Sequence, residues 1–131
     1  MSPTIGFIAT LSLTLVFLGC AVVTGYQARR KVHLSVVACA VLMLVATIYY
    51  AIELGTLYDL HHDSMITRVH LTVSKFNTGA YLLPVITGLR TIKNPEGRKL
   101  HGRVAFSVLA LTVFTAVTGC MMLYNADLLP V

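Results

Sequence analysis

The chain contains four apolar stretches, each about 20 residues long, which we place at 5–24, 34–54, 69–89 and 104–124. At a rise of about 1.5 Å per residue, a helix of that length matches a hydrocarbon core of about 30 Å. Backbone N–H and C=O groups must be paired within such a segment when lipid surrounds it, so each stretch is expected to be a helix. The sequence predicts a single all-α transmembrane domain, residues 1–131, that folds as a four-helix up-down bundle.

The composition agrees with a membrane protein. Of the 131 residues, 56% are hydrophobic and 11% are charged, whereas a soluble domain needs more charge to cover its surface. The first stretch has no basic segment before it, so we expect a retained helix rather than a cleaved signal peptide. The cysteines form no C-x-x-C pair and are expected to be small buried hydrophobic residues: Cys20, Cys39 and Cys120.

The charges are distributed unequally between the two ends of the predicted helices. Eight of the ten Lys and Arg residues fall in two loops: Arg29, Arg30, Lys31, Arg90, Lys93, Arg98, Lys99 and Arg103. Four of the five acidic residues fall at the opposite ends: Glu53, Asp59, Asp63 and Asp127. The positive-inside rule then places both basic loops in the cytoplasm and both termini on the other side. The net charge of +5 is therefore an orientation signal and no sign of nucleic-acid binding. We expect a bacterial inner (cytoplasmic) membrane, although an organelle membrane fits the same pattern.

The two basic loops have similar flanking sequences. The first follows Val-Thr-Gly at 23–25 and precedes Arg-Lys-Val-His at 30–33. The second follows Ile-Thr-Gly at 86–88 and precedes Arg-Lys-Leu-His at 98–101. This indicates two similar helical hairpins, which is a common origin of small membrane bundles. Coincidence between two basic loops is the alternative.

Two histidines are placed to bind one haem. His33 opens the second predicted helix and His101 opens the fourth, on the same side of the membrane. These helices are diagonal in an up-down bundle, with axes about 13 Å apart if neighbours pack at about 9 Å. A haem iron held between two histidines fits that gap. Gly25 and Gly88 would admit the flat macrocycle, and three arginines could pair with haem propionates: Arg30, Arg98 and Arg103. The alternatives are ordinary helix ends, solvated interfacial histidines and arginines that only set topology.

A second group of polar residues lies at the outer side. His70 starts the third predicted helix, Glu53 ends the second, and His61 and His62 lie between them. Imidazole with carboxylate suits Cu, Zn or non-haem Fe, so this is an alternative metal site. His70 and Glu53 could instead serve a quinone or protons, and loop histidines are often simply solvated.

One face of the third predicted helix is polar. His70, Ser74, Asn77 and Tyr81 recur at helical spacing. Such a face should point to the interior of the bundle, where its groups bond across helices. Pro84 frees the carbonyl of the residue four positions earlier and should kink the helix.

Short motifs over nearly the whole chain follow one order: His33, Tyr50, His70, Leu83-Pro84, His101 and Val117-Thr118-Gly119. In this the chain resembles the CtaM-like family of small four-helix membrane proteins linked to cytochrome oxidase maturation. That family has four helix histidines, which implies a bound metal or haem, and three match here. Tyr50 and Glu53 stand where the fourth is expected, so the resemblance supports the His33–His101 pair more than a four-histidine site. The chain also looks like transmembrane b-type cytochromes, with fewer helix histidines than their two-haem arrangement uses.

The leading hypothesis is a membrane protein that binds haem b and transfers electrons in a respiratory or photosynthetic complex. The alternatives are a metal- or haem-handling assembly factor for cytochrome oxidase and a structural accessory subunit of a larger membrane complex; a homo-oligomer is also compatible. No nucleophile–base pair, phosphate loop or nucleic-acid motif stands out. This pattern favours an electron-transfer or accessory protein over a stand-alone enzyme.

Overall fold

A computed structural model describes residues 2–60 and 64–129 of the chain. It contains two compact units: unit 1 comprises residues 1–59 and 128–131, and unit 2 comprises residues 60–127. Both units are helical, as the sequence predicts, and each predicted apolar stretch lies within the helical segments found.

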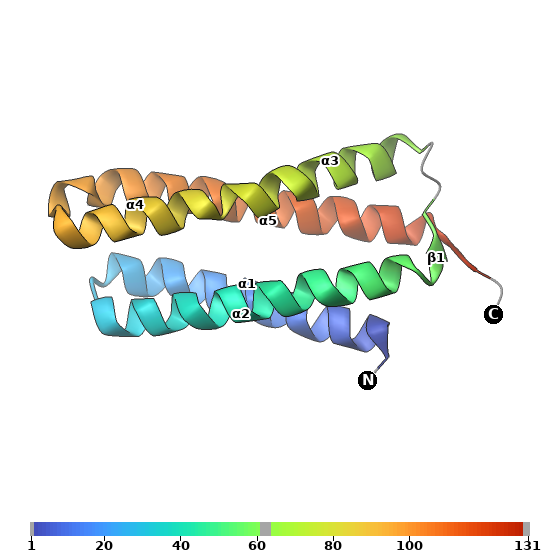
Figure 1. Ribbon diagram of the computed structural model, residues 1–131, viewed down its shortest axis with the longest axis horizontal. Coiled ribbons are helices and arrows are strands. Elements are labelled where there is room, and N and C mark those ends of the chain that lie inside the picture. The colour runs from blue at the N-terminus through green and yellow to red at the C-terminus, as the bar shows by residue number, and fades with distance from the viewer. Residues whose placement is uncertain (1, 61–63, 130–131) are drawn as a thin grey trace. The chain divides into compact units, whose positions relative to one another are not determined.

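Unit 1 is an antiparallel hairpin of α1 (Pro3–Tyr26) and α2 (Arg30–Gly55), which lie side by side along their length (Figure 1). Ser2 caps α1 with its hydroxyl on the Ile5 amide, and Pro3 occupies the first helical position, where no amide donor is needed. Small and β-branched residues fill the interface, as is typical of helices that approach closely in membranes. Midway along it, the buried hydroxyls of Thr14 and Thr47 are 3.1 Å apart.

The turn between α1 and α2 is a Schellman motif. Ala28 adopts a left-handed conformation, with φ of 56°. The Arg29 amide donates to the Thr24 carbonyl at 3.2 Å, and the Ala28 amide donates to the Gly25 carbonyl at 3.3 Å. This position usually holds glycine, because a Cβ is disfavoured there. The turn starts α2 only a few residues after α1 ends, which brings the two loop-proximal ends together.

Unit 2 contains α3 (Met65–Ala80), α4 (Leu82–Lys93), the short 3₁₀ helix η1 (Pro95–Gly97) and α5 (Arg98–Tyr124). α3 and α4 follow each other and both pack on α5 (Figure 1). The single helix predicted at 69–89 is therefore two helices that meet at Tyr81. Pro84 explains the break, because it has no amide to donate to Ala80 and its ring crowds that carbonyl. The predicted kink is confirmed.

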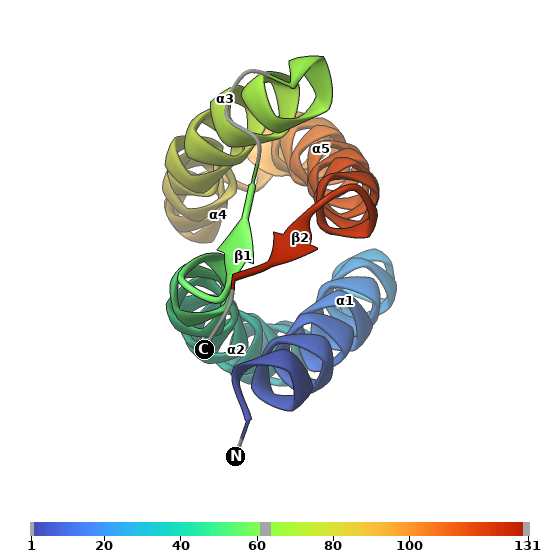
Figure 2. The ribbon, with the colours of Figure 1, turned by 90° about the vertical axis from the view of Figure 1, so that its right-hand side faces the viewer.

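Two short strands are an addition to the helical fold. β1 (Tyr58–Asp59) pairs with β2 (Asp127–Leu128), and the Leu129 amide donates to the Leu57 carbonyl at 3.0 Å (Figure 2). Leu57 and Leu129 both belong to unit 1. The C-terminal residues therefore return to the segment that follows α2.

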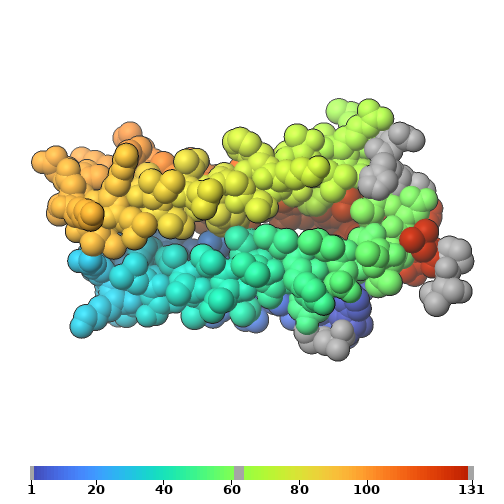
Figure 3. Space-filling view, viewed as in Figure 1, coloured from blue at the N-terminus to red at the C-terminus, as the bar shows by residue number. Residues whose placement is uncertain are grey.

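Within the described residues, three helical segments are long and apolar enough to cross a membrane: 3–26, 30–55 and 95–124. Their surfaces are apolar as well. On α2, Leu42, Val45, Tyr49 and Ile52 recur every three or four residues and are each more than half exposed, and α2 lines the face of unit 1 seen in Figure 3. These features agree with a membrane protein. α3 and α4, with 16 and 12 residues, are each shorter than one membrane span.

The cysteines differ from the prediction. Cys39 is partly buried, but Cys20 and Cys120 are exposed on their helices. Small apolar side chains are acceptable on an apolar helix surface, so hydrophobic character alone does not predict burial here.

Candidate functional site

His33, near the start of α2, lies against the end of α1. Its Nδ1 atom is 3.0 Å from the Ala21 carbonyl oxygen and 3.3 Å from the Thr24 hydroxyl oxygen. The ring lies against Gly25, where a Cβ would be 3.4 Å from Cε1 of His33, at the short limit of ordinary van der Waals contact. We call this arrangement, a histidine ring on the Thr-Gly pair of a neighbouring helix, a histidine seat.

His101, near the start of α5, occupies the corresponding seat in unit 2. Its Nδ1 atom is 3.2 Å from the Thr87 hydroxyl oxygen, and a Cβ at Gly88 would lie 3.2 Å from its Cε1. The two similar loop sequences therefore share a contact of the histidine with the threonine hydroxyl and with the following glycine. The glycines that the sequence suggested for a macrocycle first of all accommodate the histidine rings themselves.

Counting donors assigns the proton on each imidazole. The Thr24 hydroxyl donates to the Cys20 carbonyl at 2.8 Å, and the Thr87 hydroxyl donates to the Leu83 carbonyl at 2.8 Å. Each hydroxyl is closer to the carbonyl of its own helix than to Nδ1, at 2.8 Å against 3.3 Å for Thr24 and 3.2 Å for Thr87, so its single proton is assigned to that carbonyl and the threonine oxygen accepts from the histidine Nδ1–H. The Ala21 carbonyl, which can only accept, requires the same proton position on His33. In the neutral rings the lone pair is then on Nε2.

His70, near the start of α3, occupies a third seat among the described residues. Its Nδ1 atom is 3.2 Å from the Thr118 hydroxyl oxygen. The Thr118 hydroxyl donates to the carbonyls of Thr115 at 3.0 Å and Phe114 at 3.1 Å. A Cβ at Gly119 would lie 2.9 Å from Cε1 of His70, which is the closest approach of the three.

The sequence alone does not predict the seat of His70. The Thr-Gly pair at 118–119 is visible in the sequence, but nothing there indicates which histidine lies against it. The triplet Val/Ile-Thr-Gly occurs at 23–25, 86–88 and 117–119, and each copy seats a histidine. A fourth Thr-Gly pair at 78–79 follows asparagine, and no described side chain lies within 4 Å of a Cβ placed at Gly79. The dipeptide alone is therefore not sufficient.

A tyrosine takes a related position in unit 1. A Cβ at Gly6, near the start of α1, would overlap the ring of Tyr50, near the end of α2. Gly6 follows isoleucine, not threonine, so this glycine holds the ring by shape alone.

The other predicted site residues do not form part of the histidine seats. Arg30, Arg98 and Arg103 are exposed, as is Glu53. Arg30 precedes His33 by three residues and Arg98 precedes His101 by three, so each arginine is on the helix face of its histidine. Arg103 follows His101 by two residues, about 200° around the helix. His61 and His62 lie outside the described residues. In the described part of the chain, no three His, Cys, Asp or Glu residues gather as a metal site.

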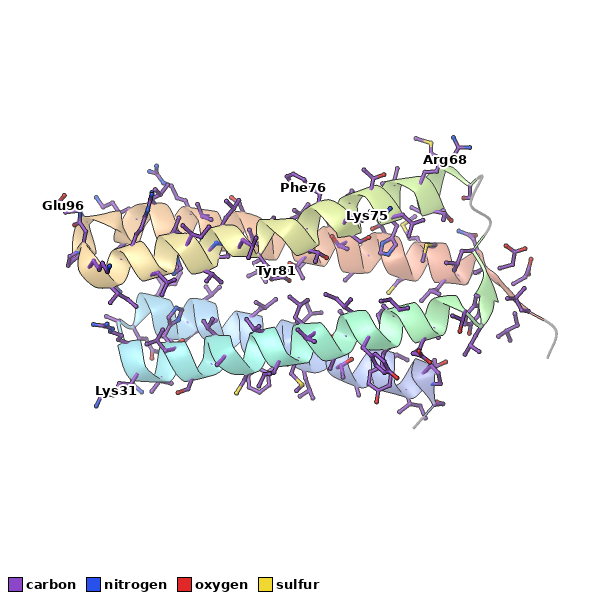
Figure 4. The ribbon with its side chains drawn as sticks, viewed as in Figure 1. Lys31, Arg68, Lys75, Phe76, Tyr81 and Glu96 are labelled. Atoms are coloured by element: carbon purple, nitrogen blue, oxygen red, sulfur yellow. The ribbon has the colours of Figure 1, made fainter. Side chains whose placement is uncertain are left out.

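The polar face predicted for α3 is directed toward α5, as expected. The Asn77 amide donates to the Thr112 hydroxyl at 3.3 Å, and the Tyr81 and Thr112 hydroxyls are 2.7 Å apart. Thr112 in turn donates to the Val108 carbonyl at 2.8 Å, so Thr112 accepts both bonds. Tyr81, at the α3–α4 break, is labelled in Figure 4. The side-chain oxygen of Asn77, Oδ1, is buried and has no hydrogen-bond partner among the described residues.

Comparison with known proteins found no matching family model, no similar curated protein and no similar solved structure.

Proposed function

We propose that this protein is a membrane haem b protein that transfers electrons, with His33 and His101 as the two axial ligands of one haem. The observation that carries the proposal is the repeated seat. Each unit contributes one imidazole whose Nδ1–H is held by a neighbouring helix and whose lone pair is on Nε2. Histidines that bind a metal usually donate their other N–H to such an acceptor, which fixes both tautomer and ring orientation.

The number of ligands favours haem over a bare metal ion. Zn²⁺ requires three or four protein ligands, and Cu²⁺ and non-haem iron also require several. A porphyrin supplies four nitrogens of its own, so the protein needs to provide only the axial ligands. The seats offer single imidazoles, and within the described residues no third ligand accompanies them. When bound, haem supplies the one-electron redox step, while the protein orients the imidazoles and excludes water.

Two arginines are suited to the propionates. Arg30 and Arg98 each precede a seated histidine by one helical turn, and guanidinium pairs with carboxylate in a bidentate manner. Helix geometry favours these two over Arg103 for this role. The repeated Arg-x-x-His spacing is thus part of the same proposal.

The proposal also includes the arrangement of the helices in the membrane. α1, α2 and α5 cross the bilayer singly, α3 and α4 cross it in series, and both basic loops are cytoplasmic. The resemblance to the CtaM-like family and to b-type cytochromes favours a place beside a respiratory oxidase or a similar electron-transfer complex. A haem carrier for oxidase assembly uses the same ligands, and reversible transfer of the haem to an acceptor would distinguish it.

The test is a dithionite-reduced minus oxidised absorption spectrum of the protein purified in detergent after expression with ample haem supply. We expect a sharp low-spin b-type signal that is lost in both His33→Ala and His101→Ala. Ser35→Ala is the matched control, because Ser35 is exposed, is two residues from His33 and bonds only its own helix at Lys31 among the described contacts.

Circular dichroism and gel filtration establish that the variants are folded. A folded wild-type protein without a haem spectrum would refute the proposal. A low-spin signal that survives either histidine substitution would refute the assignment of the ligands.

A further inference from the structure

Two of the ten Lys and Arg residues lie outside the basic loops. Eight of the ten are in or beside those loops, whereas Arg68 and Lys75 are both on α3. Figure 4 shows Arg68 near the start of α3 and Lys75 farther along the same helix. The positive-inside rule concerns basic residues in short loops, so it does not account for these two cations.

Arg68, Thr72 and Lys75 share one face of α3. Their spacing of four and then three residues places them one above the other along a helix. All three are exposed. Asn77, whose side chain bonds Thr112 on α5, is buried and lies on the opposite face. The face with the two cations therefore points away from α5.

The side chains of Thr72 and Lys75 have no hydrogen-bond or ion-pair partner in the described part of the chain. This is unusual for a threonine here. Beyond the first turn of each described helix, every other threonine donates its hydroxyl to the carbonyl four residues earlier. An ammonium and a free hydroxyl within an apolar stretch are costly unless an acceptor reaches them.

The depth of Lys75 indicates where that acceptor lies. Lys75 is six residues inside the apolar stretch 69–89, which is about 9 Å along the helix. Helical side chains lean toward the N-terminus of their helix, so Lys75 extends toward Thr72 and the start of α3. With its ammonium so placed, Lys75 approaches the membrane boundary, where lipid phosphates lie.

The surface that follows Lys75 is apolar and open. Phe76 is 69% exposed, and Leu82 and Leu83 at the start of α4 are 64% and 52% exposed. Gly79, one turn after Lys75 on the same face, is exposed, and a Cβ there would meet no described atom within 4 Å. Cationic and hydroxyl donors near the boundary, with open apolar surface below them, suit an amphiphile that has an anionic headgroup and a hydrocarbon chain.

We propose that this face of α3 binds an anionic phospholipid of the non-cytoplasmic leaflet. The lipid phosphate accepts from the Lys75 ammonium and the Thr72 hydroxyl, and an acyl chain lies over Gly79 beside Phe76. A lipid with net negative charge is favoured, because a zwitterionic headgroup brings a cation that Lys75 repels. The inference rests on the proposed arrangement of the helices in the membrane and does not involve haem.

The test uses tryptophan fluorescence, because the chain has no tryptophan of its own. Phe76→Trp places a single fluorophore beside Lys75, and phospholipids with brominated acyl chains quench it on contact. Reconstitution with brominated phosphatidylglycerol or brominated phosphatidylcholine gives the ratio of their binding constants at this site. We expect phosphatidylglycerol to bind about fivefold more tightly, as one cation near a membrane surface implies.

Variants in the Phe76→Trp background assign the preference to the site. Lys75→Met should bring the ratio close to one, Lys75→Arg should keep it, and Thr72→Val should lower it by a smaller factor. Lys93→Met is the control, because it removes an exposed lysine at the far end of α4 and should leave the ratio unchanged.

Three outcomes would overturn the proposal. A ratio close to one with Lys75 in place would leave Lys75 to a carboxylate of another membrane protein. An equal fall in Lys93→Met would show unspecific attraction to the whole basic chain. Loss of the preference on adding inorganic phosphate, but not chloride of equal ionic strength, would show a site for a small free anion. Each ratio compares one protein in two lipids, so constant quenching by a bound haem cancels and the proposed function is tested separately.

Discussion

The hydroxyl of a threonine has a single proton. The acceptor to which the hydroxyl donates this proton decides which imidazole nitrogen can bind iron. In all three seats the threonine donates to its own helix, as buried threonines in helices commonly do. The histidine must then donate from Nδ1. A valine has nearly the same shape as threonine but no acceptor, so threonine-to-valine substitutions isolate this effect.

We expect Thr87→Val to weaken haem binding by a factor of about 10–100, as is typical when the hydrogen-bond partner of a metal-bound histidine is lost. The dissociation rate of haem to an excess of apomyoglobin measures this. Thr91→Val is the control one turn away, because the Thr91 hydroxyl bonds only the Thr87 carbonyl among the described contacts. Equal dissociation rates in the two variants would contradict a role for the Thr87 hydroxyl.

The glycines allow a second prediction at this scale. Gly119→Ala places a Cβ 2.9 Å from the His70 ring, so we expect a loss of about 1–3 kcal/mol of unfolding free energy from overpacking. Gly102→Ala on the same helix meets no described atom within 4 Å, so we expect a gain of up to about 1 kcal/mol from helix propensity. Unfolding in mixed micelles measures both. The same sign for both variants would contradict the packing account.

At the scale of elements, the turn between α1 and α2 has an alanine, Ala28, in a backbone conformation that is unfavourable for it. Ala28 has φ of 56°, where a Cβ costs about 1–2 kcal/mol. We expect Ala28→Gly to raise the unfolding free energy, by about 0.5–1 kcal/mol once the greater freedom of glycine in the unfolded chain is subtracted. Thermal unfolding in detergent followed by circular dichroism measures the change. A lower melting temperature would show that the turn does not hold this conformation in solution.

The contact between α3 and α5 depends on Thr112, which accepts from both Asn77 and Tyr81. Thr112→Val should cost about 1–2 kcal/mol, since hydrogen bonds between membrane helices average about 0.6 kcal/mol and reach about 1.7 kcal/mol. Tyr81→Phe should cost less, and the double variant should cost less than the sum of the two single variants. A double-mutant cycle measures this coupling. Strict additivity would indicate that the two hydroxyls do not interact.

The sequence predicts these elements unevenly, for physical reasons. Apolar length predicts the position of the four long helical stretches, because lipid imposes a fixed thickness on a spanning helix, but it does not divide the third stretch into α3 and α4 or predict the 3₁₀ helix η1. Spacing also identified the polar face of α3, and Pro84 identified the break. The seat of His70 could not be found in this way, since its ring and its Thr-Gly pair are 48 residues apart and come together only when α3 packs on α5. The exposure of Cys20 and Cys120 was missed because their hydrophobicity does not separate a helix interface from a helix surface.

At the scale of the whole molecule, the charges allow a test of orientation. Lys31 and Glu96 lie in or beside the two loops that we expect in the cytoplasm, and Arg68 lies at the start of α3 (Figure 4). In a background without the native cysteines, Lys31→Cys and Glu96→Cys should react with an impermeant maleimide only in inverted vesicles. Arg68→Cys should react only in intact cells or right-side-out vesicles. Labelling of Lys31→Cys and Arg68→Cys from the same side would contradict the proposed topology.

The repetition of the seat also bears on ancestry. One hairpin already contains everything that a seat needs: a Val/Ile-Thr-Gly end, a short basic turn and a histidine at the start of the returning helix. Duplication of a gene for one hairpin would have produced both loop-proximal seats in a single event, with no new residue required. The contacts at the other ends of the units are not copies of one another. In unit 1 the ring of Tyr50 on the second helix lies on Gly6 of the first, whereas in unit 2 the ring of His70 on the first helix lies on Gly119 of the last.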